Sequence, residues 1–107
     1  MKQITAQELA AWLADTSREK PLLLDVREPW EFEKARIGGA QLVPMGEVAK
    51  RVGEIDREKA VVAICHHGGR SMQVALFLEK AGYNNVHNLA GGVDAWSRTV
   101  DPAIPLY

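Results

Sequence analysis

Apolar residues in this chain occur either in short unbroken runs or at helical spacing. Residues 21–26, 40–43, 60–64 and 86–89 form short apolar runs bounded by polar or turn residues, and each predicts a β-strand. The run 60–64 is β-branched and contains no polar side chain, so we expect it in the centre of a sheet. Strands buried on both faces are typical of parallel sheets that are covered by helices.

The segments between these runs carry helix signals. Thr5 and Glu8 form a capping-box pattern that predicts a helix over residues 6–15, and Pro29 predicts the start of a second helix that ends before Gly38. Residues 46–55 predict one or two short helices with a charged outer face.

The second half of the chain repeats the alternation. A broad apolar stripe predicts a helix that begins at Ser71, a natural N-cap, and ends at Gly82. A last helix follows Gly91 and Gly92 and should place Trp96 on the core, where, or at whose rim, we also expect Trp12 and Trp30. The tail 101–107 contains two prolines and should lie extended.

Composition narrows the class of protein. With 107 residues, 47% of them hydrophobic, the chain is expected to form one domain over residues 1–107 around one core. A net charge of −1 gives no global attraction to nucleic acid or to an anionic membrane, and no apolar run is long enough to span a membrane. A single cysteine cannot form an internal disulfide and suits a reducing compartment, so we expect a cytoplasmic protein. Because the sequence shows neither a charge asymmetry nor an evident apolar patch, we expect a monomer.

Alternating strands and helices predict an α/β fold whose ligands bind beyond the carboxyl ends of the parallel strands. Asp25 and Arg27 follow one such strand and Cys65 follows the central one, so these residues and Gly91 should gather at that edge. We expect any chemistry to be built around Cys65.

The loop after the central strand has the features of a thiolate site. It reads Cys65-His66-His67-Gly68-Gly69-Arg70-Ser71, and a glycine-rich turn into a helix directs backbone N–H groups toward one point. A mostly ionised thiol at neutral pH needs roughly 2.7 kcal/mol of stabilisation, and a helix terminus supplies only about 0.3–1 kcal/mol. The converging N–H groups and the charge of Arg70 should add the rest, with Asp25 or Glu31 as candidate partners of Arg70.

Simpler interpretations of these residues stay open. A free cysteine is often only a small buried residue, although the neighbouring glycines, histidines and arginine favour a reactive thiol. His66 and His67 either supply donors near the thiolate or are simply exposed. Adjacent residues rarely bind one ion together, so we expect no metal and no other cofactor. We expect His87 to serve strand packing.

Four segments in order resemble the rhodanese domain. They are Asp25-Val26-Arg27-Glu28-Pro29-Trp30-Glu31-Phe32, Ile37-Gly38-Gly39-Ala40, the loop 65–71, and Gly91-Gly92-Val93-Asp94-Ala95-Trp96. The resemblance implies a three-layer α/β/α fold with a five-stranded, mainly parallel sheet. It also implies a sulfurtransferase in which Cys65 takes a sulfane sulfur from a small anionic donor such as thiosulfate, forms a persulfide, and passes the sulfur to cyanide, a thiol or a protein. In the same reading Asp25 and Arg27 support the loop without reacting.

Two departures from the family pattern make the donor less certain than the reaction. Ala35-Arg36-Ile37 stands where many members have Gly-His-Ile, and His66 occupies a position that is often arginine.

Three other functions remain open. Phosphatases and arsenate reductases of the related fold place five residues between cysteine and arginine, whereas four separate Cys65 from Arg70, which makes a tighter cradle. A regulatory binding module is disfavoured because Cys65 is retained. A persulfide carrier that serves a protein partner has the same sequence features as an enzyme.

Overall fold

The computed structural model describes residues 1–107 and alternates strands with helices. The strands are β1 (Lys2–Ile4), β2 (Leu22–Asp25), β3 (Gln41–Leu42), β4 (Val61–Ile64) and β5 (Val86–Leu89). The helices are α1 (Ala6–Ala14), α2 (Pro29–Lys34), α3 (Gly69–Lys80) and α4 (Gly92–Thr99), and two 3-10 turns, η1 (Met45–Glu47) and η2 (Val52–Glu54), lie between β3 and β4. No helix combines the length and the apolar character that a membrane crossing requires.

The strands form one five-stranded sheet in the order β1-β5-β4-β2-β3, and every neighbouring pair is parallel. This arrangement confirms the α/β fold class and the central position of the strand that precedes Cys65. Because the strands are parallel, the residues that follow β2, β4 and β5 meet at one edge of the sheet.

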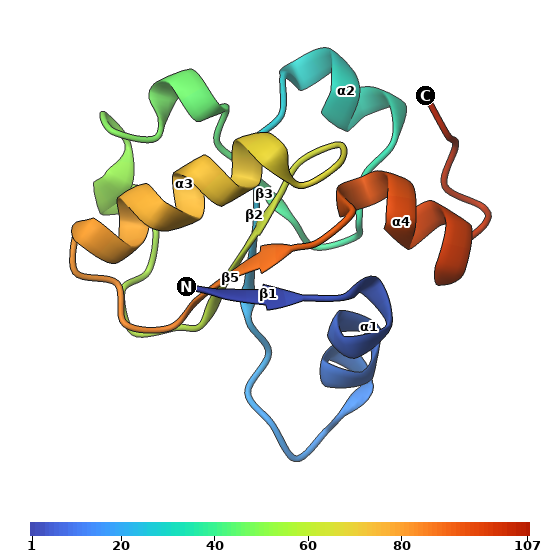
Figure 1. Cartoon of the computed structure of the whole chain (residues 1–107), viewed down its shortest axis with the longest axis horizontal. Coiled ribbons are helices and arrows are strands. Elements are labelled where there is room, and N and C mark those ends of the chain that lie inside the picture. The colour runs from blue at the N-terminus through green and yellow to red at the C-terminus, as the bar shows by residue number, and fades with distance from the viewer.

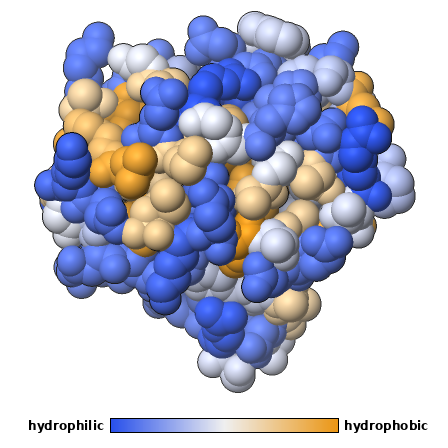
Figure 2. All heavy atoms as spheres, in the orientation of Figure 1, coloured by the Kyte–Doolittle hydropathy of each residue, from blue (hydrophilic) through white to orange (hydrophobic).

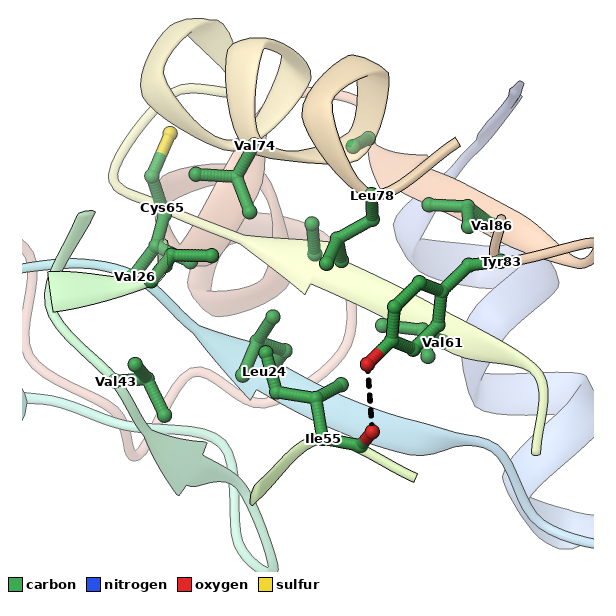
Figure 3. Close-up of a cluster of buried hydrophobic side chains, with 13 residues drawn as sticks. Leu24, Val26, Val43, Ile55, Val61, Cys65, Val74, Leu78, Tyr83 and Val86 are labelled. Carbon is green, nitrogen blue, oxygen red and sulfur yellow. Dashed lines mark hydrogen bonds between the residues drawn. The ribbon is translucent and has the colours of Figure 1, made fainter. Parts of the chain in front are cut away.

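Helices cover both faces of the sheet (Figure 1). Along β4, Val61 and Ala63 join a buried cluster with residues of α3, whereas Val62 and Ile64 join a second cluster with residues of α1 and α4. Figure 3 shows the first cluster, in which the Tyr83 hydroxyl donates a hydrogen bond to the carbonyl of Ile55 at 2.7 Å. The strict alternation along β4 is what a strand buried on both faces requires.

One strand was not predicted from the pattern. β1 pairs with β5, with Lys2 opposite His87 and Ile4 opposite Leu89. Of its three residues only Ile4 is buried, so β1 has neither an apolar run nor an alternation long enough to detect. The fifth strand therefore followed from the family resemblance alone.

Most helix predictions are confirmed, and the start of α3 is corrected. The capping box at Thr5 and Glu8 is present, and the segment 46–55 holds the two short turns. However, α3 begins at Gly69, with Gly68 as its N-cap at a positive φ of 105°. The predicted N-cap, Ser71, lies in the first turn of the helix and is buried. Glycine allows the chain to turn left-handed here, so the helix starts earlier than the hydroxyl indicated.

The tail is not extended as predicted. The amide of Ile104 donates to the carbonyl of Asp101 at 3.1 Å, which closes a turn, and the hydroxyl of Ser97 in α4 holds the carbonyl of Ile104. The turn directs the segment that follows it back toward α2. Tyr107 consequently lies beside the loop after β4, as its contacts below show.

The surface is mostly polar, with scattered apolar side chains, some of them over α3 (Figure 2). Trp12 and Trp96 are buried, as predicted, whereas Trp30 is 61% exposed and lies at most at the rim of the core. The large exposed apolar residues are Trp30, Met72, Leu76, Phe77 and Leu106.

Candidate active site

The backbone of Cys65 is fixed by the beginning of α4. The amide of Val93 donates to the carbonyl of Cys65 at 2.9 Å, and the amide of Asp94 donates to the carbonyl of His66 at 3.1 Å. Gly92 makes this approach possible because it has a φ of 59° and because a Cβ at this position would clash with both carbonyls. The pair Gly91-Gly92 therefore docks one helix against the loop that carries the thiol.

The Cys65 sulfur points toward the first turn of α3 (Figure 3). The amide of Gly68 donates to Sγ at 3.1 Å, and the Ser71 hydroxyl lies 3.3 Å from Sγ. Burial would raise the pKa of Cys65, but hydrogen bonds from the Ser71 hydroxyl and from the amides of Ser71, Gly68 and His67 outweigh it and lower the pKa. The converging N–H groups predicted from the glycine-rich loop are therefore present.

The Ser71 hydroxyl was not identified from the sequence as a partner of the thiol, and it has two possible acceptors. It also makes a short hydrogen bond to Oδ1 of Asn88, whose Nδ2 donates to the carbonyl of Gly68 at 3.1 Å. A hydroxyl has one proton, so it cannot donate to Sγ and to Asn88 at the same time. When Cys65 is a thiolate, the Ser71 hydroxyl donates to Sγ, and when Cys65 is a thiol, the hydroxyl can donate to Oδ1 of Asn88.

Arg70 is paired with Glu31, one of the two predicted partners. Its two terminal nitrogens bind the two carboxylate oxygens of Glu31 at 2.7 and 3.0 Å, and Glu31 comes from α2. The hydrogen bonds from Arg70 are the main reason that the pKa of Glu31 falls to about 2. The hydrogen bonds to Glu31 are the main cause that raises the pKa of Arg70, and the nearby charges of Glu31 and Cys65 contribute to the same shift. Arg70 thus lies near the sulfur while its charge is balanced by Glu31.

Asp25 and Arg27 form a fully buried ion pair at the end of β2, with 2.7 Å between Oδ2 of Asp25 and Nη2 of Arg27. Arg27 also donates to the carbonyl of Ala35 at 2.6 Å and to the Tyr107 hydroxyl at 2.7 Å. No side-chain hydrogen bond joins this pair to the loop 65–71 directly. Its contacts hold the segment around α2, and they reach the loop indirectly, through Glu31 and through Tyr107.

Tyr107 connects these groups and was not singled out from the sequence. Its hydroxyl accepts from Arg27 and donates to Glu31 at 2.8 Å, and its ring stacks on His66 with centroids 3.9 Å apart and planes 7° apart. Burial is the main reason that the pKa of Tyr107 rises to about 12, so the hydroxyl keeps its proton at neutral pH. Its nearest sequence neighbour in this network, Arg70, is 37 positions away, which a local pattern cannot reveal.

The two histidines of the loop differ in their surroundings. Burial is the main cause that lowers the pKa of His66, and its Nε2 is shielded without a hydrogen-bond partner, whereas His67 is exposed. His66, His67 and Asp94 each offer one potential metal-ligand atom, all within 4.8 Å of one another. Asp94 is a third potential ligand that the sequence pattern did not place beside the two histidines, and its carboxylate is paired with Arg98 at 2.9 Å.

His87 lies away from this cluster. Its ring packs edge-on against Trp12 with centroids 5.3 Å apart, which agrees with a role in packing. Both residues line a groove of about 450 Å³ beside β1 and α1 that includes no residue of the loop 65–71. The groove beside β1 and α1 is therefore not an access route to the Cys65 thiol.

Comparisons with known proteins agree with the geometry. A family model described as a rhodanese-like domain matches residues 5–99. A protein of Allochromatium vinosum named sulfurtransferase is 39% identical over 98 residues, which cover 92% of this chain and 90% of that protein. A rhodanese-like/PpiC domain-containing chloroplastic protein of Arabidopsis thaliana is 38% identical over 112 residues, and the chain spans only 38% of its length.

Solved structures show the same fold. The crystal structure of a rhodanese-like domain protein from Staphylococcus aureus superposes with a TM-score of 0.85 at 28% identity, covering 100% of this chain and 99% of that one. The strand order, the cysteine after the central strand and the family match over residues 5–99 are mutually consistent. The chain belongs to the rhodanese-like domain family.

Proposed function

We propose that this protein is a sulfurtransferase in which Cys65 carries the transferred sulfur as a persulfide. Sulfur transfer in general is supported by membership of the family and by the relative named sulfurtransferase. The observation that carries the assignment to Cys65 is its sulfur, which accepts a hydrogen bond from the Gly68 amide at the carboxyl end of the central strand. The dipoles of the amides around Cys65 stabilise negative charge on sulfur, first on the thiolate and then on the persulfide.

The proposed reaction has two steps. The Cys65 thiolate attacks the outer sulfur of thiosulfate, a new S–S bond forms, and the original S–S bond breaks with its electron pair leaving on sulfite. An acceptor nucleophile such as cyanide or a thiol then attacks the outer sulfur of the persulfide. The bond to Cys65 breaks, and the thiolate is regenerated with the electron pair. No further oxidant, reductant or cofactor is needed.

The loop residues are assigned roles by their contacts. The amides of His67, Gly68 and Ser71 form the cradle around the sulfur, and Gly69 begins α3 beside them. Ser71 also supplies the hydroxyl, and Arg70 provides a positive charge for an anionic donor. His66 and His67 form the outer part of the loop. Asp25 and Arg27 hold the α2 segment, and through Glu31 they position Arg70.

The protein acceptor and the cellular setting belong to the proposal as well. We propose that the protein acts as a cytoplasmic monomer with a thiol, cyanide or protein acceptor and without nucleic acid or membrane. A lone cysteine that must stay reduced for turnover supports the reducing compartment. The net charge of −1 supports a small or protein acceptor over nucleic acid.

The first experiment is intact-mass analysis after incubation with thiosulfate, followed by addition of cyanide. The wild-type protein is expected to gain one sulfur atom and to lose it to cyanide, whereas Cys65→Ser is expected to gain none. A sulfur atom gained equally by Cys65→Ser would refute the assignment. If neither protein gains sulfur, thiosulfate is not a donor, and the hydrolysis of phosphate esters and the reduction of arsenate would be measured next.

A further inference from the structure

We propose that Tyr107 is a positioning residue that sets how Arg70 is presented to an anionic donor. The proposal deepens the function above and rests on the assignment of Cys65 as the nucleophile. Tyr107 makes no hydrogen bond with Cys65, and it acts through Glu31. Neither the family resemblance nor the local sequence pattern assigned it a role.

The hydroxyl of Tyr107 is held in one orientation. Nη1 of Arg27 donates to it at 2.7 Å, so its own proton is left for a single acceptor, Oε2 of Glu31 at 2.8 Å. Arg27 is itself fixed by its buried pair with Asp25. The hydroxyl therefore connects a buried ion pair to the carboxylate of Glu31 in α2 and restrains its position.

The Glu31 oxygen that accepts from Tyr107 also accepts from Arg70. Oε2 lies 3.0 Å from Nη2 of Arg70, and Oε1 lies 2.7 Å from Nη1. The amide of Glu28 is the remaining donor, at 3.1 Å from Oε1. Tyr107 is thus the donor that competes with Arg70 for Oε2 and restrains the carboxylate on that side.

Loss of the Tyr107 hydroxyl makes Arg70 less available to an anionic donor, and this can happen in two ways. Without Tyr107 as a donor, Oε2 of Glu31 either binds Arg70 more strongly or moves with Arg70 away from its position. Each route reduces the fraction of Arg70 that can face an anion approaching Cys65. The ring of Tyr107 has a role of its own, because it stacks on His66 and so supports the outer part of the loop.

The variants separate these two parts of the side chain. Tyr107→Phe removes the hydroxyl and keeps the ring, whereas Tyr107→Leu removes both. Tyr83→Phe is the matched control because it deletes another hydrogen-bonded tyrosine hydroxyl, at the opposite end of α3. Thermal unfolding of each variant establishes that the comparison is made between folded proteins.

The test compares alkylation of Cys65 by iodoacetate, which is anionic, with alkylation by iodoacetamide, which is neutral. The ratio of the two rates reports the positive charge presented to an anion, and it can be measured whether or not the protein transfers sulfur. We expect Tyr107→Phe to lower this ratio by about three- to tenfold, which is the net effect of losing one ordinary hydrogen bond. The rate with iodoacetamide for Tyr107→Phe, and the ratio for Tyr83→Phe, should stay within about twofold of wild type, because sites without shared partners couple by only about 0.3–0.5 kcal/mol.

A steady-state assay with thiosulfate and cyanide adds a second readout. Tyr107→Phe should raise KM for thiosulfate and leave kcat nearly unchanged, because the hydroxyl acts on binding of the donor. Tyr107→Leu should in addition shift the imidazole resonances of His66.

An unchanged alkylation ratio in Tyr107→Phe would overturn the proposal. So would an equal loss of both alkylation rates, since that indicates general damage to the loop. If wild-type protein accepts no sulfur from thiosulfate, the proposed donor is wrong, while the alkylation ratio still decides the role of Tyr107.

Discussion

Removal of the Ser71 hydroxyl tests how the thiolate is stabilised. In Ser71→Ala, Cys65 keeps the Gly68 amide at 3.1 Å and loses the hydroxyl at 3.3 Å. Burial still raises the pKa of Cys65, and one of the hydrogen bonds that offset it is gone. The pKa of Cys65 should therefore be higher in the variant than in the wild type.

The size of the effect follows from the two acceptors of Ser71. A hydrogen bond to a charged group is worth about 1.5–3 kcal/mol, and the neutral bond to Asn88 that the hydroxyl gives up is worth about 0.5–1.5 kcal/mol. The net stabilisation of the thiolate is then about 1 kcal/mol, which corresponds to roughly fivefold less thiolate below the pKa. The rate of alkylation by iodoacetamide, measured at pH values below the pKa of Cys65, should fall by about the same factor.

The assay is the pH dependence of alkylation, measured for wild type, Ser71→Ala and Tyr83→Phe. The profile of Ser71→Ala should move to higher pH, while the limiting rate at high pH should stay similar. Tyr83→Phe controls for the loss of a buried hydroxyl elsewhere in the same cluster. A Ser71→Ala profile that coincides with wild type, or that moves to lower pH, would refute the assignment of the hydroxyl to the thiolate.

Three further predictions concern the groups around the loop. Gly92→Ala should lower the free energy of unfolding by at least about 2 kcal/mol in denaturant titration, because a Cβ is strained at a φ of 59° and meets the carbonyls of Cys65 and His66. Asp25→Ala should cost about 3–5 kcal/mol by the same measurement because it leaves Arg27 buried without its partner, whereas Arg98→Ala, at an exposed pair, should change stability little. NMR titration should find Glu31 with a pKa of about 2, so its pair with Arg70 stabilises the fold fully above the ordinary pKa of glutamate and loses this contribution as the pH falls toward 2. Arg70→Ala should raise the pKa of Glu31, and an unchanged pKa would contradict the pairing.

The parts of the site that could be predicted from the sequence depend on local signals. A parallel strand buried on both faces is an apolar run, so the run 60–64 indicated both β4 and the place of Cys65. Glycines next to a cysteine indicated a turn that directs amides toward the sulfur, and the amide of Gly68 does so. These inferences needed no knowledge of distant residues.

The parts that could not be predicted depend on long-range contacts. Ser71 looked like an N-cap because its hydroxyl suits that role, but the left-handed turn at Gly68 starts the helix earlier and leaves the hydroxyl for Cys65 and Asn88. Tyr107 reaches Glu31 across 76 positions of the sequence, and a turn at the start of the tail is what returns it to the site. Neither contact has a periodicity or a motif.

The negative charge of the thiolate and the positive charge of Arg70 are stabilised by different groups, and this keeps the thiolate reactive while a cation stays near it. The sulfur is stabilised mainly by the dipoles of amides and a hydroxyl, whereas the Arg70 charge is balanced by Glu31. An unpaired arginine directed at the thiolate would lower the pKa further, but nucleophilicity of a thiolate falls as its pKa falls. Pairing Arg70 with Glu31 instead keeps a cation near the sulfur for an incoming dianion without binding the thiolate itself. The donor then competes with Glu31 for Arg70, and this competition makes the Tyr107 hydroxyl important for donor binding.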